Sequence, residues 1–166
     1  SVIDDVESPE PREMPEVPDA DEIREESGKT KLMVVEDNAE LRSFIISSFN
    51  GDYSFCEAGD GKAAIEIALQ EIPELIISDV MMPEMDGITM TSKLKKDIRT
   101  SHIPIILLTA KATDQAKITG LTSGADDYLV KPFNNDELIL KVRNMIESRN
   151  RVREKVRIEF MREGPA

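Results

Sequence analysis

Short apolar runs recur along the chain at intervals of roughly 20–25 residues, and polar or helix-patterned segments separate them. The runs cover residues 31–35, 53–57, 75–78, 105–108 and 128–130. Apolar runs of this length between turn residues are typical of β-strands, and the third and fourth are apolar on both faces, as in the middle of a parallel sheet. The second is polar at alternate positions, which favours a place near a sheet edge.

Helical periodicity follows the first run. Asn38 is typical of a helix N-cap, and apolar or small residues then recur at helical spacing at Leu41, Phe44, Ile45, Ser48 and Phe49. Further helices are predicted at about 61–72, 87–96 and 114–122, and from Asn134 onward. Strands that alternate with helices indicate a parallel sheet with helices on both faces. We therefore expect a flavodoxin-like, doubly wound α/β fold with five strands in the order 2-1-3-4-5.

Charge is distributed unevenly along the 166-residue chain. Residues 1–30 carry 11 acidic side chains against three basic ones, a net charge of −8 out of −12 for the whole chain, together with four prolines. Such a composition cannot bury enough apolar surface to offset the entropy of ordering. We expect an acidic flexible linker at 1–30, one domain at 31–149, and an extension of the last helix with a tail at 150–166.

Composition also excludes several classes of protein. The net charge of −12 argues against direct nucleic-acid binding by this segment. Cys56 is the single cysteine, so an internal disulfide is excluded and a reducing compartment is favoured. No run approaches the roughly 18 apolar residues of a membrane span. We expect a cytoplasmic segment without membrane contact, which is compatible with a membrane anchor elsewhere in a parent chain.

Polar and charged residues that could take part in binding or catalysis lie where the predicted strands end. Glu36 and Asp37 follow the first strand, Asp79 the third, Thr109 the fourth and Lys131 the fifth. Parallel strands share their carboxyl ends, and open α/β sheets bind ligands at that edge. Three carboxylates in one pocket repel each other unless a cation lies among them. Oxygen ligands without His or Cys suit Mg²⁺, so the sequence predicts a magnesium site.

The same groups are suited to phosphoryl transfer onto Asp79. A carboxylate can act as the nucleophile, while the metal and Lys131 offset charge on the phosphoryl oxygens and the Thr109 hydroxyl adds a donor. Taken singly, each of these residues is also an ordinary cap, strand end or surface lysine. Their joint placement at four strand ends favours a functional site.

Four motifs in the chain resemble the response-regulator receiver domain of two-component signalling. They are residues 34–38, 78–87, 108–111 and 124–133, within a resemblance that runs from about 31 to 149. The acidic segment before the domain and the basic helix after it also resemble the receiver segment of hybrid proteins. Those proteins join a sensor kinase, a receiver and a DNA-binding domain in one chain.

The resemblance implies that Asp79 accepts a phosphoryl group from a phosphohistidine of a histidine kinase, in the same chain or in another. It implies that Mg²⁺ is held by Asp37, Asp79 and the backbone carbonyl of Met81, with Glu36 acting through water. The domain would then catalyse its own phosphorylation and dephosphorylation. Through the resulting change of conformation it would control an output domain, with transcription regulation as the expected output.

Further residues take roles from the same resemblance. Thr109 and Lys131 would contact the phosphoryl group and report its presence. Tyr128 matches the aromatic switch residue of the family, which turns inward as Thr109 moves. The peptide bond between Lys131 and Pro132 would be cis, an isomer that X-Pro bonds reach at modest cost.

Three alternatives compete with this interpretation. A hydrolase with an aspartyl intermediate usually has a second acidic residue two positions after the nucleophile, where this chain has Met81. A flavin- or nucleotide-binding module is disfavoured because Glu36 and Asp37 would repel phosphates. A docking domain that works without phosphorylation is opposed only by the presence of all the acids and the lysine.

The last helix carries a heptad-like pattern of positions. Its members are Leu138, Val142, Met145, Arg149, Val152 and Val156, with the arginine interrupting the apolar series. We expect a continuous helix to about Phe160 that pairs with another copy to form a homodimer. The basic residues between 149 and 157 are interpreted as a solvated helix face.

Overall fold

The computed structural model describes residues 28–110 and 123–163. Its strands form one parallel sheet in the order β2-β1-β3-β4-β5, which confirms the flavodoxin-like arrangement. The strands are β1 (Thr30–Val35), β2 (Tyr53–Ala58), β3 (Leu75–Asp79), β4 (Ile105–Thr109) and β5 (Asp127–Val130). The half-buried β2 lies at one edge, as its alternating polarity predicts.

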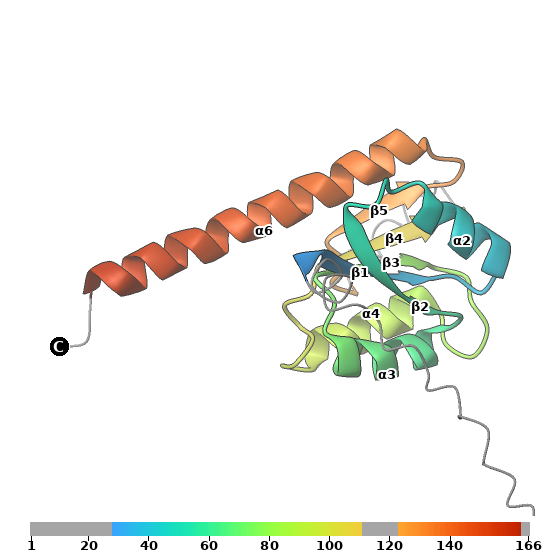
Figure 1. Cartoon of the computed structure of the whole chain (residues 1–166). Coiled ribbons are helices and arrows are strands. Elements are labelled where there is room, and N and C mark those ends of the chain that lie inside the picture. Colours follow the sequence, from blue (N-terminus) through green and yellow to red (C-terminus); the bar gives the residue numbers. More distant parts are fainter. Residues whose placement is uncertain (1–27, 111–122, 164–166) are drawn as a thin grey trace, which may run out of the picture.

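Helices cover both faces of the sheet. They are α2 (Ala39–Ser47), α3 (Gly61–Glu71), α4 (Gly87–Lys96) and α6 (Asn135–Glu163). In Figure 1, α2 and α6 lie on one face and α3 and α4 on the other. The helix predicted at 114–122 lies outside the described residues. Within the described part of the chain, no helix combines the length and the apolar character that crossing a membrane requires.

The core consists of two apolar layers, one on each side of the sheet. Leu32 and Val34 of β1 belong to the layer shared with α2 and α6, whereas Met33 and Val35 belong to the layer shared with α3 and α4. Successive side chains of a strand point to opposite faces, so a strand that is covered on both sides must be apolar throughout. All of β3 and β4 is buried, as their sequences predict.

The register between strands brings the polar strand ends together. Val35 pairs with Ser78, so Glu36 follows β1 at the level at which Asp79 ends β3. Asp79 pairs with Leu108, which places Thr109 one step further along, and Thr109 pairs with Val130, the residue before Lys131. The polar residues at the strand ends therefore lie side by side along the carboxyl edge of the sheet.

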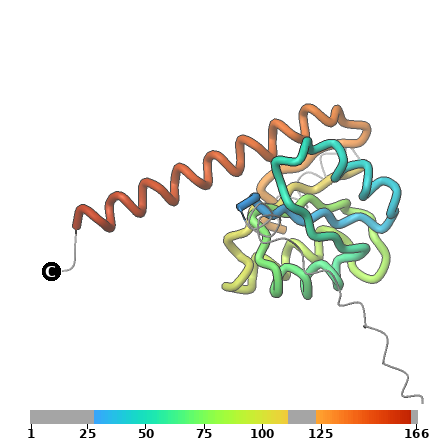
Figure 2. The backbone as a smooth tube through the Cα atoms, viewed as in Figure 1, coloured from blue at the N-terminus to red at the C-terminus, as the bar shows by residue number. Residues whose placement is uncertain are grey.

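The last helix, α6, has 29 residues, and all its buried residues lie in its first half. Leu138, Val142 and Ile146 are buried, whereas every residue from 150 to 163 is exposed. Figure 2 shows this second half extending away from the body of the domain. The predicted continuous helix is confirmed, and it ends three residues beyond Phe160 at Glu163.

The first helix differs from its predicted pattern at one position. Asn38 caps α2 as expected, because its side chain accepts a hydrogen bond from the Leu41 amide. Ile45 and Phe49 are buried, but Phe44 is 56% exposed although it shares their helical spacing. The sheet covers a narrower strip of α2 than the apolar positions span.

Candidate functional site

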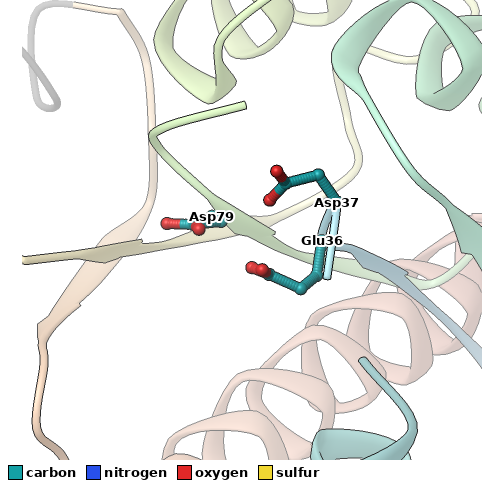
Figure 3. A group of neighbouring side chains, drawn as sticks. All are labelled: Glu36, Asp37 and Asp79. Carbon is teal, nitrogen blue, oxygen red and sulfur yellow. The ribbon is translucent and has the colours of Figure 1, made fainter. Parts of the chain in front are cut away.

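Three carboxylates meet at the carboxyl edge of the sheet. Glu36 and Asp37 come directly after β1, and Asp79 is the last residue of β3. One oxygen from each lies within 4.8 Å of the others, and Figure 3 shows the three side chains directed into a common space. The groups that the sequence places at separate strand ends are thus brought together, in an all-oxygen donor set that suits a hard divalent cation.

Burial disfavours the charged forms of the carboxylates in this cluster. Glu36 is 3% exposed and Asp79 is 7% exposed, while Asp37 reaches the solvent. Burial, followed by the close approach of the Asp79 carboxylate, raises the pKa of Glu36 to about 7. Glu36 Oε2 accepts no hydrogen bond from the described residues. A buried oxygen without a donor is typical of a position that a cation or its bound water satisfies, so the site fits Mg²⁺.

One cation of the protein partly offsets these charges. Lys131 Nζ lies 3.1 Å from Asp79 Oδ2 and 4.0 Å from Glu36 Oε2. Its amide donates to the Thr109 carbonyl over 2.7 Å, which continues the β4–β5 pairing by one residue and fixes where the side chain starts. The peptide bond from Lys131 to Pro132 is cis. An ammonium group beside a carboxylate nucleophile is well placed to contact an incoming anion.

The remaining predicted residues lie around this centre. Thr109 is buried at the end of β4, next to the strand that carries Asp79. Tyr128 is half-buried in β5 and packs with the layer of α3 and α4. Met81 is 69% exposed in the loop after β3. Phosphoryl contact by Thr109, switching by Tyr128 and metal binding by the Met81 carbonyl stay predictions.

Two further residues support the site, and the sequence assigns no role to either. Arg42 of α2 donates from Nη1 to the Glu36 carbonyl over 2.7 Å and from Nε to Glu57 over 3.0 Å, so it fixes the chain just after β1. Gly87 donates its amide to the Val80 carbonyl and lies directly against the end of β3. Arg42 lies outside the four motifs of the sequence, whereas Gly87 is the last residue of the motif at 78–87.

The raised pKa of Glu36 leads to a stability prediction. Because folding disfavours the charged form, the favourable contribution of Glu36 is complete below pH 4.5 and is lost as the pH rises through about 7. Glu36→Gln should therefore be more stable than the wild type at pH 8 without divalent cations, by about 1–3 kcal/mol, and about equally stable at pH 4.5. Denaturant unfolding in EDTA at both values measures this difference.

The control for this measurement is Glu66→Gln, at an exposed position of α3. It should change the free energy of unfolding by less than about 0.5 kcal/mol at either pH. A Glu36→Gln chain that is less stable than the wild type at pH 8 would show that the carboxylate is favourably placed without a cation.

Comparison with known proteins agrees with this geometry. The family model described as "Response regulator receiver domain" matches residues 32–143. The chain is 48% identical over 130 residues to histidine kinase P4 of Formosa agariphila, a match that covers 78% of this chain and 10% of that protein. It is 34% identical over 137 residues to the DNA-binding transcriptional regulator RpaA of Synechocystis, covering 81% of this chain and 57% of the regulator.

A solved structure shares both the fold and part of the sequence. It is the receiver domain of the sensor histidine kinase PA1611 from Pseudomonas aeruginosa, with a magnesium ion coordinated in the active-site cleft of that protein. It is 28% identical, with a TM-score of 0.66, and the match covers 72% of this chain and 98% of that domain. With a matching family model over most of its length and the expected groups at its strand ends, the chain belongs to the response regulator receiver domain family.

Proposed function

We propose that the chain is a phosphorelay receiver in which Asp79 accepts a phosphoryl group from the phosphohistidine of a histidine kinase. The observation that carries this proposal is the ion pair of 3.1 Å between Lys131 and Asp79 inside a cluster of three carboxylates. A structural ion pair alone would not need two further carboxylates beside it, because they add repulsion. Membership of the receiver family supports the same role.

In the proposed reaction, an Asp79 oxygen bonds to phosphorus while the bond between phosphorus and the histidine nitrogen breaks. The electron pair of that bond stays on the departing imidazole. Asp37, Asp79 and the Met81 carbonyl would hold Mg²⁺, and Glu36 would act through a bound water. The ion would supply positive charge beside the phosphoryl oxygens. Lys131 provides the second positive charge from the protein itself.

Phosphorylation is proposed to change the conformation of the domain. Lys131 would exchange its contact with Asp79 for one with a phosphoryl oxygen, and the Thr109 hydroxyl would donate to another. Tyr128, which is half-buried in the neighbouring strand, would turn inward as Thr109 moves. The output of this change is proposed to be control of transcription through another domain or protein.

The chain spans about a tenth of the length of the histidine kinase and 57% of the transcriptional regulator to which it is similar. We therefore propose that it works as one cytoplasmic module of a hybrid protein, with the kinase in the same chain. In that arrangement residues 1–30 link to the preceding module, residues 31–149 form the receiver, and residues 150–166 continue toward the output. A membrane anchor would belong to another part of such a protein.

The direct test is incubation of the chain with acetyl phosphate, followed by intact-mass measurement. One phosphoryl group per chain should be added in the presence of Mg²⁺, and the bond should be labile in base, as an acyl phosphate is. EDTA should lower the rate at least about tenfold, which is about 1.4 kcal/mol. Labelling that proceeds equally well in EDTA would contradict the role proposed for the three carboxylates.

A second proposal concerns pairing of α6 with another copy of the chain. Val152 and Val156 continue the heptad spacing and are 60% and 59% exposed, so the described residues leave them uncovered. Light scattering should then give a dimer whose population falls in the double variant Val152→Glu, Val156→Glu. A wild-type chain that is monomeric at the highest attainable concentration would rule this pairing out.

A further inference from the structure

Three arginines form a row along one face of α6. Arg149, Arg153 and Arg157 are spaced four residues apart, which places them on successive turns of the same face. Arg149 Nη1 donates to the Glu74 carbonyl over 2.6 Å, and Arg153 Nη1 lies 2.9 Å from Glu74 Oε2. No ion pair involves Arg157 within the described residues, although it continues the row by one turn. The row therefore starts at the domain and extends beyond it.

The point at which the chain enters the domain lies beside this row. The Glu74 amide donates to the carbonyl of Lys31, the second residue of β1, over 2.8 Å. Glu74 thus contacts both the first strand and the first two arginines of the row. In Figure 2 the blue start of the described chain lies on the side of the domain from which α6 extends.

The charges of the two segments are complementary. Residues 149–157 contain five basic side chains and one acidic one, a net charge of +4 in a chain of −12. Residues 19–26, just before the domain, contain five acidic side chains and one basic one, a net charge of −4. Glu74 has a single carboxylate and faces two guanidinium groups, so it cannot neutralise both.

We propose that residues 19–26 bind along the arginine row of the same molecule. The tether is short, because only residues 27–29 separate this segment from β1 and three residues span at most about 10–11 Å. The eight residues of the segment can follow the row, since residues 149–157 of the helix rise about 12 Å. Exposed ion pairs are individually weak, typically below about 1 kcal/mol. A short tether raises the effective concentration of the acidic segment to about millimolar, so several weak pairs suffice.

This contact would join the segment that precedes the domain to the helix that follows it. The arginine row lies at the amino edge of the sheet, where Glu74 precedes β3, whereas the carboxylate cluster lies at the carboxyl edge. The acidic segment can therefore bind or leave without touching Asp79. The contact does not require phosphorylation of Asp79. Labelling of Asp79 by acetyl phosphate should therefore be the same whether or not the contact forms.

The test is a distance measurement by pulsed electron resonance on the full chain. Nitroxide labels are attached at Ala20→Cys and Asn150→Cys in a Cys56→Ser background. We expect a narrow, short distance at about 0.01 M salt, where the Debye length is about 30 Å, and a long, broad one at about 1 M, where it is about 3 Å. A distribution that is broad at both salt concentrations overturns the proposal.

Two matched pairs of variants locate the contact. Neutralising four acids of the proposed segment should abolish the short distance (Asp21→Asn, Glu22→Gln, Glu25→Gln, Glu26→Gln). Neutralising four acids nearer the amino terminus should leave the short distance unchanged (Asp4→Asn, Asp5→Asn, Glu7→Gln, Glu10→Gln). On the helix, Arg157→Gln should weaken the short-distance peak, whereas Arg151→Gln, which is turned away from the row and lies near Glu147, should not.

Dilution of the labelled chain with an excess of unlabelled chain separates the remaining outcomes. A short distance that persists places the acidic segment on its own molecule. A short distance that disappears would place it on a second copy and overturn the proposal. If equal effects come from both sets of acid substitutions, the attraction is a general charge effect, and the assignment of residues 19–26 is wrong.

Discussion

The Asp79→Asn chain should take up no label from acetyl phosphate in the presence of Mg²⁺, while the wild type is labelled to completion. An amide oxygen carries no negative charge and is a poor nucleophile, so the reaction loses the group that forms the new bond. We expect the rate to fall at least about 100-fold, which is about 2.7 kcal/mol of transition-state stabilisation. Intact-mass measurement over time gives both rates.

The variant should remain folded, because the change is isosteric and also removes one of three repelling carboxylates. Circular dichroism and denaturant unfolding check this. Asp52→Asn, at an exposed turn, is the matched control and should be labelled at the wild-type rate. Labelling of Asp79→Asn at more than a few per cent of that rate would mean that another carboxylate is the acceptor, with Glu36 and Asp37 as the neighbouring candidates.

The location of the site could be predicted from the sequence because it depends on strand order alone. Once the apolar runs are assigned to a parallel sheet in the order 2-1-3-4-5, the residues after the strands must share one edge. The register then leaves little freedom, since Val35 opposite Ser78 brings Glu36 level with Asp79. What the sequence could not supply is how deeply each carboxylate is buried, and hence the raised pKa of Glu36.

Contacts between distant segments were the least accessible to sequence reasoning. The heptad pattern predicts Arg149 only as an interruption of an apolar series, yet its side chain is half-buried and donates to the carbonyl of Glu74, 75 residues away. The pattern of one helix carries no signal for a partner on another segment. Phe44 shows the converse, because helical spacing identifies an apolar stripe but not how much of that stripe the sheet covers.

Gly87→Ala should unfold the chain more easily, by about 2–4 kcal/mol, and should slow labelling of the molecules that remain folded. A Cβ atom at this position would lie 2.2 Å from the Asp79 carbonyl oxygen and 3.1 Å from the Asp79 carbonyl carbon. Both atoms belong to the backbone of a central strand, so the added carbon cannot be accommodated by rotating a side chain. The loop that carries Met81 must then move away from Asp79.

The sign of the change in the free energy of unfolding shows whether the clash with Asp79 or the higher helix propensity of alanine dominates. Gly87 is the first residue of α4 and has no positive φ, so without a clash alanine should stabilise the helix by up to about 1 kcal/mol. The control is Gly59→Ala, whose Cβ would meet only Arg42 Nη1 at 3.9 Å and should change stability by less than about 0.5 kcal/mol. Stabilisation by Gly87→Ala in denaturant unfolding would show that the loop after β3 does not press on Asp79. Destabilisation together with slower labelling would show that the close packing of Gly87 against the Asp79 backbone both stabilises the fold and positions the nucleophile.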